Sequence, residues 1–238
     1  MSTLTRNLLN DPELKEFGFR VDKVDPQCVL SLPGYPGFGR QSKDLSRFAN
    51  HGTISGATWV RQPTGIQVLS FDGTDDRVDF GTPATLRPTN TAFSFEFWLK
   101  HTGVAGTERQ PLRNGVNWGA FKGMLLYIPS VSQVMTFNLG DGVANTGLTC
   151  NAAMTPNWEH WAFTWDLSNM RAYRNGDIQA DTPAFAGPII YDGTVNFLWG
   201  GPTGNSFLGL MAQARFYSVA LSQKVIKSHY QQEKNLLN

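Results

Sequence analysis

The chain has few cysteines, and this limits its covalent chemistry. Cys28 and Cys150 are the only two in 238 residues. Two cysteines are too few for a disulfide framework, and neither has a second thiol nearby, as a thiolate metal site requires. Because cysteine is among the most frequently buried residue types, free and buried thiols are favoured. A single disulfide between the two is the alternative that the sequence leaves open.

Charged residues and long hydrophobic runs are also scarce. Charged residues make up 16% of the chain and the formal net charge is +1, so the composition predicts no nucleic-acid partner. No run approaches the roughly 18 apolar residues of a membrane span, which predicts no membrane insertion. Residues 1–20 lack the apolar core of an export signal. We therefore expect a protein made in a reducing cytoplasm.

The residues that are abundant are typical of an all-β protein. The chain has 24 glycines, 13 prolines and 12% aromatic residues, and 41% of its residues are hydrophobic. This mixture is expected when many short strands are joined by many turns. A single domain is favoured, since β-sandwiches often reach about 200 to 250 residues.

Alternation of apolar and polar residues predicts the strands. In residues 93–100 every second side chain is large and apolar, whereas residues 158–165 carry large side chains on both faces. Asn175 and Gly176 tolerate positive φ and predict a tight hairpin turn. Further strand candidates, at the spacing typical of a sandwich, are residues 67–71, 77–80, 124–128, 134–139, 194–199 and 209–217.

The two ends of the chain carry the helix signals. We divide the chain into an N-terminal arm, residues 1–27, and a globular domain, residues 28–238. A short helical turn is predicted in the arm, where Asp11-Pro12 is a helix start and Gly18 a helix end. Ser222 is a helix N-cap and predicts a short C-terminal helix over residues 223–233.

Several segments, in this order, resemble one known family. They are Asn50-His51-Gly52-Thr53, the aspartate-rich stretch 71–80, the strand 93–100, Trp158-Glu159-His160-Trp161-Ala162, Tyr173-Arg174-Asn175-Gly176, and the closing segment 209–222. Together they are similar to the laminin G-like and pentraxin-like branch of the concanavalin A-like jelly rolls, from about Val29 to Tyr230. The resemblance implies an antiparallel β-sandwich jelly roll used for adhesion or for carbohydrate and protein recognition.

Glycosidases share this wider fold, and they need two carboxylates flanking the scissile bond. The region from Val29 to Ser222 holds only three glutamates, Glu96, Glu108 and Glu159. The strand around Glu96 offers no second acid at an alternating position. The sequence therefore predicts a protein that is not an enzyme.

One dense group of carboxylates stands out, formed by Asp72, Asp75, Asp76 and Asp79. Hard cations such as calcium take six to eight oxygen ligands, several of them from carboxylates. The favoured interpretation is a tight turn in which the carboxylates accept backbone N–H groups and a glycine supplies positive φ. Calcium is the alternative. The resemblance weakens it, because related calcium sites also use an acid in the closing strand, where this chain has Met211-Ala212-Gln213. We expect no other cofactor.

Exposed aromatic rings are the usual platforms for sugars, flanked by amides and carboxylates. The candidates lie in or beside glycine-rich turns, and the alternative for each is a place in the core. They are Tyr35, Phe38, Trp118, Tyr127, Tyr191 and Trp199.

These observations favour a non-enzymatic binding module. The first hypothesis is a virion component of the phage type that decorates a capsid or fibre, with the arm of residues 1–27 docking onto neighbouring protein subunits. Such a protein would reach the virion surface after synthesis in the host cytoplasm, and a homo-oligomer is expected, with a trimer as the guess. The alternative is a lectin or adhesion domain that binds glycans, cytoplasmic or released without a signal peptide.

Overall fold

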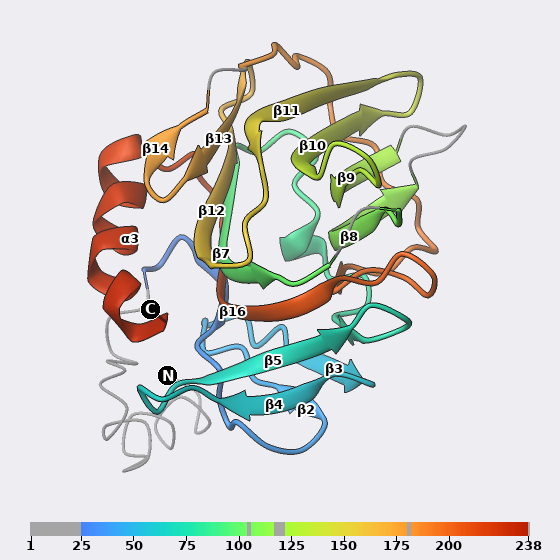
Figure 1. Cartoon of the computed structure of the whole chain (residues 1–238). Coiled ribbons are helices and arrows are strands. Elements are labelled where there is room, and N and C mark those ends of the chain that lie inside the picture. Colours follow the sequence, from blue (N-terminus) through green and yellow to red (C-terminus); the bar gives the residue numbers. More distant parts are fainter. Residues whose placement is uncertain (1–24, 104–105, 117–121, 180–181, 238) are drawn as a thin grey trace.

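The computed structural model describes residues 25–103, 106–116, 122–179 and 182–237. In this part of the chain the fold is all-β, with two antiparallel sheets packed face to face and one long C-terminal helix (Figure 1). The prediction of an antiparallel β-sandwich jelly roll is confirmed. The predicted arm falls almost entirely outside the described residues, and the first strand begins at Cys28.

Sheet 1 contains the strands with the strongest sequence signals. Its order is β14-β13-β12-β7-β16-β5-β4, and β1 pairs with β16. The strands are β1 (Cys28–Leu32), β4 (Thr58–Arg61), β5 (Gln67–Asp72), β7 (Phe93–His101), β12 (Trp158–Trp165), β13 (Met170–Arg174), β14 (Asp177–Ile178) and β16 (Leu208–Tyr217).

Sheet 2 has the order β11-β10-β9-β8-β15-β6-β3-β2. Its strands are β2 (Gln41–Ser42), β3 (Gly52–Ser55), β6 (Arg77–Asp79), β8 (Arg109–Val116), β9 (Lys122–Ile128), β10 (Val134–Asp141), β11 (Asn145–Ala153) and β15 (Leu198–Trp199). A short 3-10 helix, η2 (Ala84–Leu86), lies in the connection from sheet 2 to sheet 1. The sequence predicted six residues at 194–199, but only the last two form a strand.

The core lies between the sheets and is rich in aromatic rings. Alternation places Phe93, Phe95 and Phe97 of β7 inward, where they meet Phe137 of sheet 2 and Phe163 of the adjacent strand β12. Burying an aromatic side chain removes about 150 to 250 Å² of surface from water, so these rings dominate the hydrophobic stabilisation. Cys28 and Cys150 are buried and form no disulfide, as the sequence predicted.

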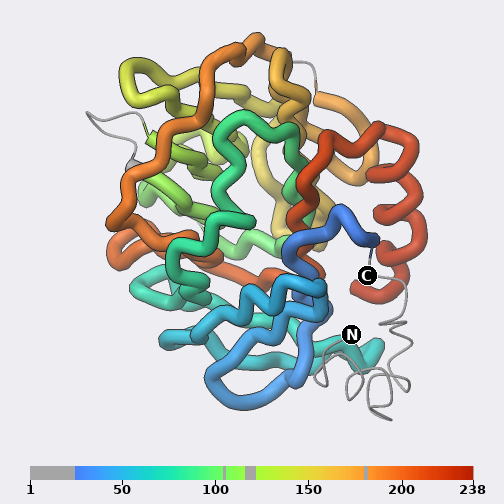
Figure 2. The backbone as a smooth tube through the Cα atoms, turned by 180° about the vertical axis from the view of Figure 1, so that it is seen from behind, coloured from blue at the N-terminus to red at the C-terminus, as the bar shows by residue number. Residues whose placement is uncertain are grey.

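The helix α3 (Gln223–Leu237) packs on the outer face of sheet 1, beside β12 and β14 (Figures 1 and 2). It starts where the sequence predicts and continues four residues beyond the predicted end at residue 233. The outer face of sheet 1 is therefore covered by a helix. Among the described residues, no helix is both long and apolar enough to cross a membrane.

The predicted hairpin turn is present between β13 and β14. Asn175 and Gly176 have φ values of 55° and 81°, which suit the two central positions of a type I′ turn. A Cβ atom at Gly176 would lie 2.9 Å from the Cα of Lys227 in α3. The glycine is thus required twice, by the turn and by the close approach of the helix.

Candidate functional site

The outer face of sheet 2 carries a row of polar side chains across three adjacent strands. Arg113 of β8 lies opposite Leu125 of β9, and Leu125 lies opposite Asn138 of β10. The residues that precede or follow them, such as Leu112 and Leu126, belong to the core. Because side chains alternate between the two faces of a strand, Arg113, Leu125 and Asn138 point away from the core.

Arg113 is a half-buried cation without a carboxylate partner among the described residues. Its Nε donates a hydrogen bond to the carbonyl oxygen of Gly115, at 3.0 Å. Burial lowers its pKa, yet a guanidinium stays charged at neutral pH. Its two Nη groups, which make no hydrogen bond within the described ranges, remain as donors for a ligand.

Asn138 is 6% exposed, and its side-chain amide makes no hydrogen bond in the part of the chain that the structure describes. A buried amide normally has a partner. Its Oδ1 lies 2.7 Å from the place where a Cβ at Gly147 would stand, so the amide lies over that glycine on β11. The absence of a side chain at Gly147 leaves the amide approachable from that side.

An aromatic ring lies at one end of this row, and a group of three paired glycines lies at the other. Tyr127, one of the predicted ligand residues, is half-buried on the same face, opposite Thr136. On the other side, Gly115 lies opposite Gly123, which lies opposite Gly140. A ring for the apolar face of a sugar, with donors and acceptors for its hydroxyls, is the usual composition of a carbohydrate site. We call Arg113, Leu125, Tyr127 and Asn138 the Arg113 face.

The other predicted aromatic residues are scattered. Trp199 is 3% exposed, packs edge-on against Phe71 in the core, and therefore cannot serve as a surface platform. Tyr191 is half-buried and donates its hydroxyl to the carbonyl oxygen of Pro88. Trp118 lies outside the described residues. The structure thus places only one of the six predictions, Tyr127, on the Arg113 face.

Tyr35 and Phe38 lie together in the loop between β1 and β2, at one end of the sandwich. Tyr35 is half-buried, whereas Phe38 is 68% exposed. Trp59 of β4 reaches the same loop, where its Nε1 donates to the carbonyl oxygen of Gly39, at 3.1 Å. The sequence did not select Trp59, because nothing local shows that β4 lies against this loop.

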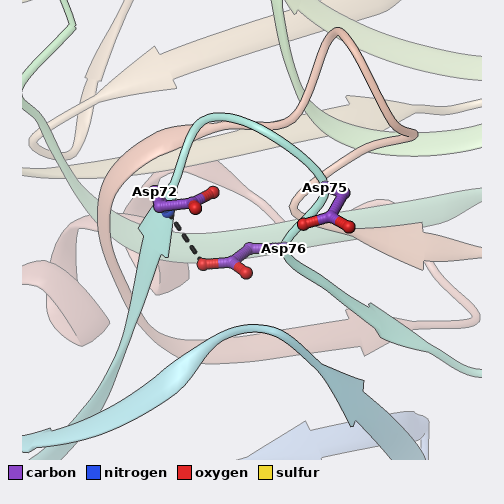
Figure 3. Close-up of side chains that lie close together, drawn as sticks. All are labelled: Asp72, Asp75 and Asp76. Carbon is purple, nitrogen blue, oxygen red and sulfur yellow. Dashed lines mark hydrogen bonds between the residues drawn. The ribbon is translucent and has the colours of Figure 1, made fainter.

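The turn between β5 and β6 brings three of the four predicted carboxylates together (Figure 3). Ligand oxygens of Asp72, Asp75 and Asp76 all lie within 4.8 Å of one another. Since calcium binds oxygens at about 2.3–2.6 Å, one ion could contact all three. Two of the carboxylates already accept backbone hydrogen bonds, however. Thr74 N–H donates to Asp72, and Asp72 N–H donates to Asp76, each at 2.8 Å.

Burial, together with the neighbouring negative charges, raises the pKa of Asp76. The backbone hydrogen bonds are those of the predicted tight turn. Asp79 does not join the group, because its two carboxylate oxygens accept from the amide of Asn196, each at 3.0 Å. Calcium at Asp72, Asp75 and Asp76 stays a prediction.

Comparison of the sequence with profiles of known protein families identifies the superfamily of this chain. The sequence profile of the concanavalin A-like lectin/glucanases superfamily matches residues 72–227. The chain belongs to this superfamily. No curated protein matches the sequence significantly.

Several solved structures that share this fold are binding domains of toxins. The binding domain of paraclostridial mosquitocidal protein 1 is 15% identical, with a TM-score of 0.70, over 88% of this chain and 53% of that one. The binding domain of botulinum neurotoxin serotype D, solved in complex with N-acetylneuraminic acid, is 15% identical with a TM-score of 0.67, over 90% and 52%. This lectin/glucanase-superfamily chain therefore spans about half the length of these neighbours, and at such identities the likeness concerns the fold.

The superfamily includes glucanases, and a glucanase needs a carboxyl group that can donate a proton to the leaving group. Glu96 of β7 is fully buried on the outer face of sheet 1, beneath α3. Burial alone would raise its pKa, but hydrogen bonding from His229 and the charge of Arg215 lower it well below the usual range. A carboxyl held in the ionised form cannot donate a proton as a general acid. Its contacts with Arg215 of β16 and His229 of α3 instead join the helix to the sheet.

The residues that the sequence failed to reveal are Arg113 and Asn138. The strand β8 contains Pro111 and Gly115, which disfavour a strand prediction, so its alternation was not recognised. The strand β10 was predicted, but a single asparagine on its outer face gives no signal of its own. Only the pairing of β8, β9 and β10 shows that these side chains are neighbours.

Proposed function

We propose that this chain is a carbohydrate-binding module without catalytic activity, and that a glycan lies on the Arg113 face across β8, β9 and β10. The observation that carries this proposal is the pair Arg113 and Asn138. Both bear polar groups with no partner among the described residues, and the strand register places both on the same face as Tyr127. Neither residue has a fully buried unpaired polar atom, so these groups are open to solvent and a ligand hydroxyl or carboxylate would take the place of water there.

The superfamily and the solved neighbours support a binding role. One neighbour is a ligand-binding domain solved with N-acetylneuraminic acid, and another, the binding domain of botulinum neurotoxin DC, was solved with the protein rat synaptotagmin II. Both ligands belong to chains about twice as long as this one. The proposal for this chain therefore depends on its own residues.

The test is a glycan array on the full chain, followed by calorimetry with the best hit. We expect Arg113→Gln and Asn138→Ala each to weaken the affinity by tenfold or more, since each removes hydrogen bonds of a charged or buried group. Gln41→Ala is the matched control, because Gln41 is exposed on the far strand β2 of the same sheet. A glycan whose affinity is unchanged in both variants would overturn the assignment to this face. An array without any hit would overturn the carbohydrate function.

Attachment to a viral particle remains a second proposal. It includes the docking of residues 1–27 onto neighbouring subunits, a trimer, and a location on the virion surface. Its support comes from the sequence alone, because residues 1–24 of the arm lie outside the described part of the chain. Failure of the full chain to co-purify with assembled particles would refute it.

A further inference from the structure

The loop between β1 and β2 lies at an extremity of the described molecule (Figures 1 and 2). Phe38 is 68% exposed. Its neighbours Gly37 and Gly39 have φ values of 76° and 74°, in the left-handed region where glycine is favoured. Because the flanking residues have no side chains, the ring stands alone at the surface.

The loop is held in place by contacts with sheet 1. A Cβ atom at Gly34 would lie 2.2 Å from the carbonyl oxygen of Gln67, and one at Gly37 would lie 2.4 Å from the Gln67 Cγ. Lys43 N–H donates to the carbonyl oxygen of Tyr35, at 3.1 Å, and Trp59 Nε1 donates to Gly39. Phe38 is therefore presented on an ordered loop, so little conformational entropy is lost when the ring is buried by a partner.

The exposed charges in the stretch of sequence around this loop are of one sign. Between Val29 and Phe71 the sequence has a single acid, Asp44. Its buried carboxylate accepts four hydrogen bonds, from the N–H groups of Ser31, Ser46 and Asn50 and from the Ser46 hydroxyl. It therefore satisfies local backbone groups and presents no charge to the surface.

Four cations occupy the same stretch of sequence, namely Arg40, Lys43, Arg47 and Arg61. None of them forms an ion pair within the described residues. Arg40 is the last residue of the loop between β1 and β2. Arg61 lies opposite Gln67, the residue against which Gly34 and Gly37 pack. The Lys43 ammonium lies 5.3 Å from the centre of the Tyr35 ring.

We propose that this end of the sandwich docks peripherally on a lipid surface that contains anionic headgroups. Phe38 enters the boundary between headgroups and acyl chains, where an apolar ring is favoured, and Tyr35 and Trp59 lie at the polar interface. Arg40, Lys43 and Arg61 approach the lipid phosphates, each with a gain of about fivefold in affinity.

A polyanionic glycan is the competing partner, because it would pair with the cations and a sugar would stack on the Phe38 ring. A bilayer also accepts the ring and the cations, and it is favoured because its headgroup boundary takes up an apolar side chain that projects from a loop. The sequence predicts no membrane insertion because it has no long apolar run. A single side chain on a loop leaves no hydropathy signal, and it anchors peripherally without spanning the bilayer.

The test is sedimentation of the full chain with vesicles of phosphatidylcholine alone or with about one fifth phosphatidylserine. We expect binding to the anionic vesicles only, weakened by added salt as screening requires. Phe38→Ala should weaken binding about tenfold, and Arg40→Gln with Arg61→Gln should reduce the preference for phosphatidylserine to the roughly fivefold that Lys43 supplies. Val131→Ala is the matched control, because Val131 is 87% exposed in another turn, and it should bind as the wild type does.

Each alternative outcome is distinct. Equal binding of wild type and Phe38→Ala to anionic vesicles would refute the role of the ring and leave only charge. Absence of vesicle binding, with retention on a sulfated polysaccharide, would overturn the proposal in favour of a polyanionic glycan. Thermal melting of each variant checks the fold, and the exposed position of Phe38 leads us to expect unchanged melting.

Discussion

The Nη1 of Arg215 lies 2.9 Å from the Oε1 of Glu96, and the Glu96 side chain has no exposure to solvent. The two residues face each other across β16 and β7. The helix α3 completes the group, since His229 contacts Glu96 and Glu233 pairs with Arg215. Trp98 Nε1 also donates to Glu233, at 2.8 Å. A buried network of charges thus fixes α3 on sheet 1.

Removing the central charge should destabilise the fold. In Glu96→Gln the guanidinium of Arg215 and the imidazole of His229 lose their buried anion. Breaking a buried pair from one side costs about 3 kcal/mol or more, so we expect the free energy of unfolding to fall by that amount in urea titrations. Lys227→Gln, which removes an exposed pair with Asp177, is the control and should change it by less than about 1 kcal/mol. Equal effects would contradict the network.

Stability should also fall as the solution becomes acidic, in two windows. Burial lowers the pKa of His160, although the charges of Glu96 and Glu233 partly oppose this. The unfolded chain then binds more protons than the folded one below about pH 6.5, so stability is lost from there downward. The lowered pKa of Glu96 adds a second loss below about pH 4.5.

Urea midpoints measured between about pH 7.5 and pH 5.5 isolate the histidine window, because the glutamate remains ionised throughout. We expect His160→Gln to flatten the slope of stability against pH in this range. Gln41→Ala, a substitution of an exposed residue without an ionisable group, should retain the wild-type slope. A slope that survives in His160→Gln would show that another group titrates.

Both thiols should be unreactive in the folded protein. Burial raises the pKa of Cys28 to about 12, and its Sγ donates to the carbonyl oxygen of Leu30, at 3.0 Å. Since the thiolate is the reactive form, Cys28 should not react with a disulfide reagent at neutral pH. Cys150 is also buried. We expect no labelling of the native chain and labelling of both cysteines in denaturant; rapid native labelling would contradict the burial.

Calcium should have little effect on thermal stability. Asp72 and Asp76 already accept backbone hydrogen bonds in the β5–β6 turn, so their charge is partly satisfied without a cation. We expect the melting temperature to be the same in millimolar calcium as in a chelator. If calcium instead raises it, and Asp75→Asn removes the rise, the ion binds at this turn and stabilises by mass action.

Strong alternation made sheet 1 predictable. The strand β7 carries large apolar side chains at four successive inward positions and β12 at three, and the Asn175-Gly176 turn has a local chemical cause. The strands β8 and β11 were not predicted. Pro111 and Gly115 interrupt the first, and the second lies at the sheet edge, where its side chains are mostly exposed.

The sequence by itself determined the all-β fold, the family and the chemistry available in each loop, because alternation and turn residues act over a few neighbouring positions. Only the tertiary structure decided which of those residues meet. It buried Trp199 in the core, turned Asp79 toward Asn196, and brought Arg113, Tyr127 and Asn138 onto one face. The physical reason is strand register, which is set by contacts between segments far apart in the chain and leaves no trace in any single one.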